Sequence, residues 1–161
     1  MSQSDAISVT RTETGYVVSV HGQGTRNQSP AVRDFISGAM EDKASVVLDL
    51  SLCVCGGSTF LGRLMILHKR GCQHERFSVH ADDAVSKKLL HPTRLDTILP
   101  RCEDLPKTVG PAVPLPIIDL ERDEFGRHLI DTHEELAEVD SPTSGAFRMV
   151  CDQLRKELGE M

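Results

Sequence analysis

Ser58 and Thr59 are the side chains of this sequence whose type and position best suit a chemical role. They follow Gly56 and Gly57 and stand directly before an apolar pattern with helical spacing. The first backbone N–H groups of a helix have no partner within it, so a hydroxyl there can cap them and a phosphate there meets the positive end of the helix dipole. The position fits two uses: a structural N-cap, which is the commoner one for serine, or a phosphorylation site.

A strand and a helix must hold this hydroxyl pair in place. Residues 46–50 form a β-branched and aliphatic run, apolar on both faces up to Asp49, which predicts a central strand covered on both sides. After the glycines, one face of a predicted helix carries Phe60, Leu61, Leu64, Met65 and His68, while Arg63, Lys69 and Arg70 fall largely elsewhere. We therefore expect a strand, a tight loop and a helix that Gly71 ends, with Ser58 at the helix start.

Two short motifs of this unit resemble the STAS domain, the fold of bacterial anti-sigma-factor antagonists. In that family a strand ending in Asp-Leu-Ser leads to Asp-Ser-Ser-Gly-Leu-Gly, and the first of those two serines is phosphorylated by a partner kinase. This chain has Asp49-Leu50-Ser51 and then Gly57-Ser58-Thr59-Phe60-Leu61-Gly62. The resemblance covers roughly residues 6–104.

The resemblance implies a binding function in a partner-switching circuit of transcription regulation. An anti-sigma factor or a related serine kinase would dock on the serine loop and the following helix, and phosphorylation of Ser58, or of Thr59, would release it. The loop from Gly22 to Arg26 would lie beside the serine loop and join the same surface. The partner-binding residues that the resemblance implies are Gly22, Gly24, Thr25, Arg26, Gly56, Gly57, Ser58, Thr59, Leu61, Gly62 and Arg63.

Two positions depart from the family motif. Gly57 stands where the family has an acidic residue, and Phe60 replaces a glycine. A second hypothesis follows from these departures: a non-phosphorylated STAS scaffold that self-associates, for example as a homodimer, or binds a partner through its C-terminal helices. A third, a small-molecule-binding or catalytic domain, would need a deep polar pocket.

The first hundred residues alternate predicted strands and helices. Residues 7–12 and 16–20 predict a β-hairpin, and the polar loop 21–28 could also cradle a phosphate, although Gly-x-Gly alone is a weak signal. Ser29 before Pro30 predicts a cap for a helix with the stripe Val32, Phe35, Ile36, Ala39 and Met40. Further on we expect a strand at 76–80 and a helix opened by Asp82 and Asp83. Residues 95–99 then predict either a short helix or one turn that leads into a last strand near 99–103. This pattern predicts an α/β fold with a STAS-like mixed sheet in residues 1–104.

The remainder of the chain differs in composition. Four prolines between residues 105 and 118 predict an extended connector. Residues 119–161 predict a helical hairpin, with one stripe of Phe125, Leu129, Ile130, His133, Leu136 and Ala137 and, after a cap-and-proline start at Ser141-Pro142, another of Phe147, Val150, Cys151, Leu154 and Leu158. The hairpin is too small to bury both stripes by itself, so it must dock on the body, pair with a second copy or receive a partner.

Charge and composition exclude several classes of function. Residues 119–161 carry twelve acidic and five basic side chains, which accounts for the net charge of −6 and disfavours nucleic-acid binding. No apolar run is long enough to cross a bilayer, residues 1–5 lack the features of a signal peptide, and the five cysteines are an odd number. We therefore expect a cytoplasmic protein with reduced thiols and no membrane partner.

Metal binding and catalysis are the chemical alternatives to a binding module. Cys53 and Cys55 precede the helix that starts at Ser58, whereas His68, Cys72 and His74 lie at its far end, about 20 Å away at about 1.5 Å rise per residue, which disfavours a shared metal ion. The Gly-x-Ser-x-Gly pattern is absent, and nothing in the sequence positions a base for Ser58. We therefore expect no metal, no cofactor and no enzyme.

Overall fold

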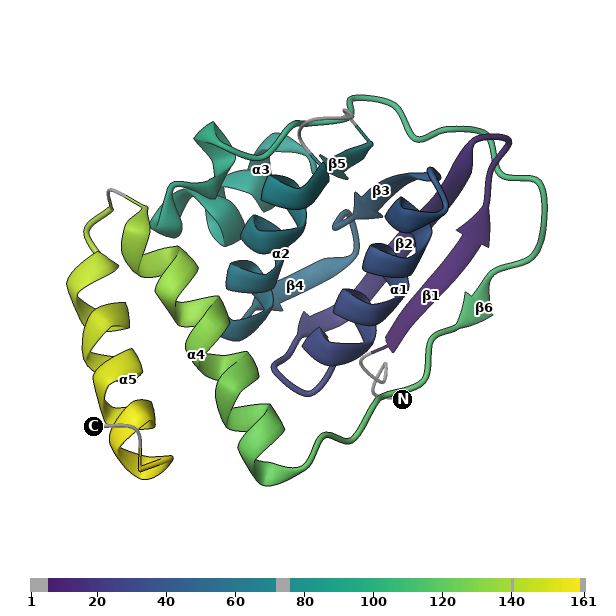
Figure 1. Cartoon of the computed structure of the whole chain (residues 1–161). Coiled ribbons are helices and arrows are strands. Elements are labelled where there is room, and N and C mark those ends of the chain that lie inside the picture. The colour runs from purple at the N-terminus through teal and green to yellow at the C-terminus, as the bar shows by residue number, and fades with distance from the viewer. Residues whose placement is uncertain (1–5, 72–75, 140, 160–161) are drawn as a thin grey trace.

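A mixed β-sheet forms the centre of the molecule. The computed structural model describes residues 6–71, 76–139 and 141–159. Within them the strands β1 (Ala6–Arg11), β2 (Gly15–Gly24), β3 (Ser45–Asp49), β5 (Phe77–His80) and β6 (Val113–Pro114) lie in the order β5-β3-β2-β1-β6 (Figure 1). β1 pairs antiparallel with β2 and β6, whereas β3 runs parallel to β2 and β5. The predicted hairpin and mixed sheet are therefore confirmed.

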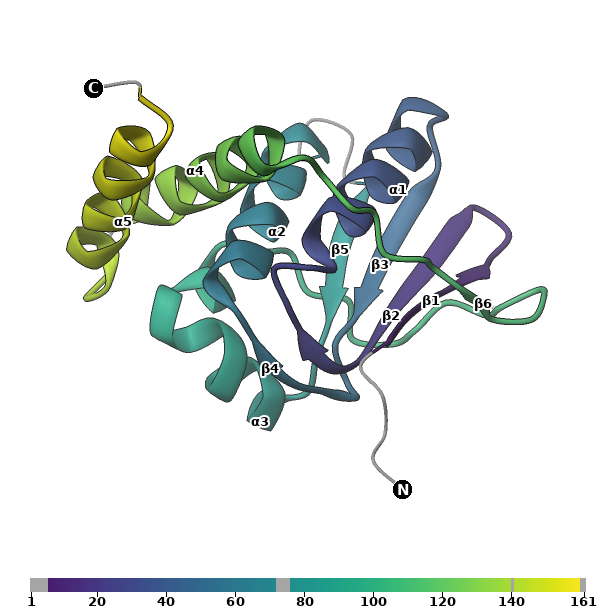
Figure 2. The same ribbon diagram turned by 90° about the horizontal axis from the view of Figure 1, so that it is seen from below.

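Helices α1 (Ser29–Glu41) and α2 (Ser58–Gly71) pack side by side on one face of the sheet (Figures 1 and 2). Burial alternates along β3, where Val46 and Leu48 are buried and Val47 is only half-buried. The prediction that β3 is covered on both sides is therefore wrong. The helices of the first hundred residues mainly cover one face of the sheet, and the parallel pairing of β3 does not by itself bury the opposite face.

The strand β4 (Cys53–Gly56) was missed by the sequence analysis and leads directly into α2. It pairs parallel with the end of β2, which continues to Gly24 rather than ending in a loop at residue 21 as predicted. The register shifts between Gly22 and Gln23, and Gly22 has a φ of 79°, a conformation that glycine adopts at little cost. The extension brings the residue 24–26 segment next to the start of α2.

The start of α1 also differs from the prediction. The N-cap is Gln28 without a side-chain cap, and Ser29 is the first helical residue and fully buried. Pro30 stands at the start of the helix as expected, and Val32, Ile36 and Ala39 of the predicted stripe are buried. Ser29 is thus used for another contact, described below.

Residues 77–121 complete the body and run round its edge. After β5, Asp82 caps the short α3 (Asp83–Val85), and a π-helical turn, η2 (Ser86–Leu90), and two 3-10 turns, η3 (His91–Thr93) and η4 (Leu95–Thr97), follow. The expected last strand is reduced to an isolated bridge between Val79 and Arg101. The proline-rich segment is extended and adds β6 to the edge of β1, a position that proline tolerates because its missing N–H faces away from the ladder (Figure 1).

The chain ends in two antiparallel helices that dock on the body. α4 (Arg122–Glu138) lies against α2, and α5 (Ser144–Glu157) lies on the outer side of α4 (Figure 2). We call α4 and α5 the C-terminal hairpin. Its docking in cis is the first of the three arrangements considered, and α5 begins at Ser144 after Thr143, not at the predicted cap Ser141. Within the described residues, no helix has the length and apolar character needed to span a bilayer.

Candidate functional site

Ser58 is the first residue of α2, directly after β4 and Gly57, and its side chain is half-buried. The Gly57 N–H donates to the carbonyl of Gly24 at 2.8 Å, which joins the serine loop to the residue 24–26 segment as the resemblance implied. The sheet fixes both segments, because β2 and β4 are hydrogen-bonded neighbours at this point. The hydroxyl is therefore presented on a rigid strand-to-helix junction.

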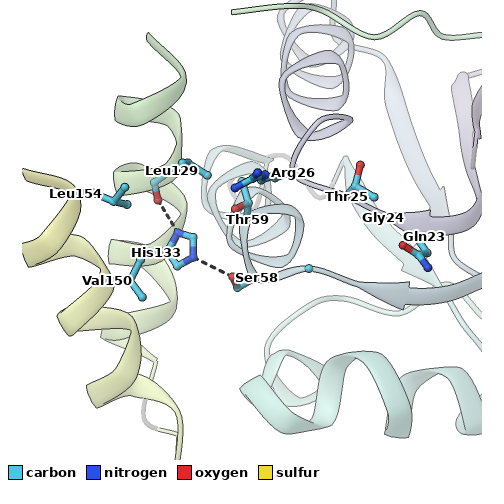
Figure 3. A pocket seen from close by; sticks show the side chains of 11 residues that line it. Gln23, Gly24, Thr25, Arg26, Ser58, Thr59, Leu129, His133, Val150 and Leu154 are labelled. Carbon is cyan, nitrogen blue, oxygen red and sulfur yellow. Dashed lines mark hydrogen bonds between the residues drawn. The ribbon is translucent and has the colours of Figure 1, made fainter. Parts of the chain in front are cut away.

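The hydroxyl of Ser58 has a partner on the C-terminal hairpin (Figure 3). Its oxygen lies 2.8 Å from Nε2 of His133, and Nδ1 of His133 lies 2.6 Å from the carbonyl of Leu129. Because a carbonyl only accepts, Nδ1 carries the proton, and Nε2 accepts from the Ser58 hydroxyl. The structure therefore places a base beside Ser58 that the sequence analysis did not position there. Sequence reasoning placed His133 in an apolar stripe, and its polarity within that stripe was the available signal.

A cavity of about 450 Å³ opens beside this pair, between the body and the hairpin. Arg26 lines the cavity from the residue 24–26 segment, and His133 reaches toward Ser58 from α4 (Figure 3). Leu129, Val150 and Leu154 form an apolar wall on the hairpin side. The remaining lining residues are Gln23, Gly24, Thr25, Gly57, Ser58 and Thr59.

The structure distributes the predicted partner-binding residues over surface and interior. Arg26 and Gly57 are exposed, and Gly22, Thr25, Gly56 and Ser58 are half-buried. Gly24 is buried against the ring of Phe60, where a Cβ atom would lie 2.9 Å from a ring carbon. Thr59, Leu61, Gly62 and Arg63 are buried. In this arrangement these four residues therefore present little surface to a partner.

Gly62 lets α4 approach the backbone of α2. A Cβ atom at this position would lie 2.1 Å from the carbonyl oxygen of Thr132 and 2.8 Å from its Cα. Such distances leave no room for any side chain, and backbone atoms cannot rotate away. The close approach is therefore a specific feature of the α2–α4 contact.

Arg63 lies beneath α4 in a buried polar cluster, which corrects its predicted position away from the buried face. Nδ1 of His128 accepts from Arg63 at 3.0 Å and from Arg33 at 3.3 Å, so Nε2 carries the proton and donates to Ser29 Oγ at 2.7 Å. His128 is 2% exposed and Arg63 is 3% exposed. Burial, and then the neighbouring Arg33, lowers the pKa of Arg63 to about 10, so the guanidinium stays charged at neutral pH.

His128 should make the stability of the protein depend on pH. Burial, followed by the charges of Arg63 and Arg33, lowers its pKa to about 3, from 6.5 in an unfolded chain. Between these values the unfolded state binds more protons, so the free energy of unfolding falls as the pH falls, by at most about 1.4 kcal/mol per pH unit. Urea unfolding at about pH 7 and about pH 5 measures this. His128→Gln, which keeps an acceptor and a donor without titrating, should have the smaller loss, and equal losses in both proteins would contradict the assignment.

The Cys and His residues that were weighed as metal ligands, and disfavoured, can be placed only in part. Cys53 is buried at the start of β4, and Cys72 and His74 lie outside the described residues. Among the described residues, no group of three or more His, Cys, Asp or Glu side chains is placed to hold a metal ion.

Comparison with known proteins identifies the fold. No family model and no curated protein sequence matches this chain. An anti-sigma factor antagonist from Mycobacterium paratuberculosis has a similar solved structure, with 27% sequence identity and a TM-score of 0.55, over 63% of this chain and 88% of that chain. More than a third of this chain therefore has no counterpart there. This similarity confirms the STAS-like mixed α/β fold and the resemblance to anti-sigma-factor antagonists that the Asp49-Leu50-Ser51 and Gly57-to-Gly62 motifs predicted.

Proposed function

We propose that this protein is a non-enzymatic STAS-type regulator that binds an anti-sigma factor or a related serine kinase, and that phosphorylation of Ser58 releases this partner. The observation that carries the proposal is the place of Ser58 at the junction of β4 and α2, half-buried and beside an open cavity, in a chain similar to an anti-sigma factor antagonist. The proposal extends to regulation of transcription in the cytoplasm.

Burial favours Ser58 over Thr59 as the acceptor. Both residues line the cavity, but Thr59 is only 4% exposed, whereas Ser58 is half-buried. In the transfer, a bond forms between Ser58 Oγ and the γ-phosphorus of ATP as the bond to ADP breaks, and the hydroxyl proton passes to a base. The dianion then adds charge and bulk at the docking surface.

A partner and the C-terminal hairpin compete for α2 in this proposal. The exposed part of the predicted surface is small, with Arg26 and Gly57 at its rim, because α4 lies on α2 and contacts Gly62 and Arg63. Binding through α2 therefore requires the hairpin to move aside.

A second candidate is a scaffold that uses the hairpin itself. Met149 is 74% exposed and Val150 is 39% exposed on the outer helix α5. These side chains could contact a partner or a second copy without any modification of Ser58. Deletion of residues 119–161 distinguishes the two candidates, because only the scaffold candidate predicts that the deletion abolishes assembly.

Ser58→Ala should block release of the partner. We expect the wild-type protein, bound to a kinase encoded beside it, to lose at least about tenfold in affinity after addition of ATP, which corresponds to ~1.4 kcal/mol. Ser58→Ala should stay bound, and Thr59→Val should release as wild type does. Size-exclusion chromatography with mass spectrometry of the released protein measures both. Unchanged release of Ser58→Ala would overturn the switch.

A further inference from the structure

The cavity beside Ser58 lies against the acidic C-terminal hairpin but has no acidic side chain among its described lining residues. Residues 119–161 carry twelve acidic side chains, yet none lines this cavity, although Leu129, His133, Val150 and Leu154 of the hairpin do. The side chains there that can carry positive charge are those of Arg26 and His133. A site with cationic groups and no carboxylate among its described lining residues suits an anion.

The two groups come from the two bodies that meet at the cavity. Arg26 belongs to the segment between β2 and α1, and His133 belongs to α4 (Figure 3). An anion bound by both would therefore connect the STAS body to the hairpin. The first turn of α2, which begins at Ser58, adds the positive end of a helix dipole.

The cavity has room for a phosphoryl group on Ser58. A water molecule occupies about 30 Å³ in the liquid, so a group of one phosphorus and three oxygens needs the space of a few waters. The cavity volume of about 450 Å³ exceeds this several times. Ser58 itself lines the cavity, so the ester oxygen is at its edge.

We propose that this cavity is a receptor in cis for a phosphoryl group carried by Ser58, and that the phosphate fastens the C-terminal hairpin to the STAS body. This inference rests on the proposed function, because it takes Ser58 as the modified residue. Arg26 and His133 would bind the phosphate oxygens, and α4 would stay on α2. The phosphorylated protein then loses its partner because its own hairpin holds the docking surface, in addition to any direct repulsion.

The hydrogen bond of the unmodified protein prepares this exchange. Nε2 of His133 accepts from Ser58 before modification, with the Nδ1 proton held by the Leu129 carbonyl. Once Ser58 carries the phosphate and the hairpin lies on α2 again, Nε2 can bind a proton from solvent. The resulting imidazolium donates from both nitrogens, to Leu129 and to the phosphate, which replaces a neutral hydrogen bond with a charge-assisted one.

Phosphoserine inserted at position 58 during translation tests the receptor without any kinase. We expect hydrogen exchange of α4 to slow about tenfold relative to the unmodified protein, and the second pKa of the phosphate, about 6 in free phosphoserine, to fall by about one unit in ³¹P NMR. Exchange of β1, which pairs with β2 and β6 away from the hairpin, is the internal reference for intact folding.

The control variants separate the receptor from a general charge effect. Arg26→Gln and His133→Phe should each remove most of the difference between modified and unmodified protein, and comparison within each variant cancels its own effect on docking. Arg122→Gln removes an exposed arginine of the hairpin that does not line the cavity and should keep the full difference.

Faster exchange of α4 in the phosphoserine protein would show that the phosphate expels the hairpin, and unchanged exchange with a phosphate pKa near 6 would show that it stays in solvent. Either result overturns the receptor. Absence of phosphate on Ser58 in cells would instead overturn the proposed switch, while leaving the measured affinity of the cavity for a phosphate unchanged.

Discussion

Gly62→Ala should detach the C-terminal hairpin from α2. The added methyl group would lie 2.1 Å from the Thr132 carbonyl oxygen, and neither helix backbone can rotate away. Alanine gains about 1 kcal/mol over glycine in a helix, but overpacking against backbone costs about 1–3 kcal/mol or more. Because this contact demands a shift of more than an ångström, we expect a net loss of about 2 kcal/mol in the free energy of unfolding.

Gly38→Ala is the matched control, since it makes the same change within α1 where no atom lies within 4 Å of the added Cβ. It should stabilise the protein by about 0.5–1 kcal/mol. Urea unfolding measures both variants, and hydrogen exchange should show faster exchange in α4 and α5 with β1–β3 unchanged. If Gly62→Ala matched Gly38→Ala in stability, the two helices would not approach as closely as described.

This variant also bears on function, because the hairpin covers the part of α2 that the resemblance assigns to a partner. An undocked hairpin uncovers Gly62 and Arg63, which contact Thr132 and His128 of α4, and the sequence of the serine loop is unchanged in this variant. The proposed competition therefore predicts tighter partner binding by Gly62→Ala, whereas a scaffold that binds through the hairpin predicts no gain.

The sequence predicted the elements that local patterns specify. The alternation in residues 7–20 and the aliphatic run at 46–50 become β1, β2 and β3, and the helical stripes become α1, α2 and α4. These features depend on side-chain periodicity, which the sequence contains directly. The Gly-Ser motif marked the start of α2 at Ser58, whereas the strand that leads into this helix is the unpredicted β4 and not the strand that ends at Asp49.

The features that the sequence did not predict depend on contacts between distant residues. β4 is short and reaches its partner through a shifted register, so no periodic pattern marks it. Serine is a common N-cap residue, yet Ser29 instead accepts a hydrogen bond from His128, 99 residues away, in a buried cluster. Arg63 is charged and was placed away from the buried face because nothing local shows that α4 will cover it. His133 meets Ser58 for the same reason, since the docking angle of the hairpin is a tertiary property.

His128→Leu should strongly destabilise the attachment of α4. The substitution removes the acceptor of the buried Arg63, whose Nε already has no hydrogen-bond partner among the described residues. A hydrogen bond to a charged group contributes about 1.5–3 kcal/mol, and a charge left buried without a partner costs more than the lost bond. We expect a loss of about 3 kcal/mol in the free energy of unfolding by urea denaturation at about pH 8, well above the pKa of His128 in either state.

Adding Arg63→Met to the His128→Leu variant should recover most of this loss. The second substitution removes the buried charge that His128→Leu leaves without a partner, and it fills a similar volume with apolar atoms. The two residues are in contact, so their effects should couple by about 1–2 kcal/mol in a double-mutant cycle. Additive effects would show that Arg63 reaches solvent when His128 is absent. Recovery in the double variant would show instead that the polar cluster contributes little net stability, and that its role is to specify where α4 lies, with His133 above Ser58.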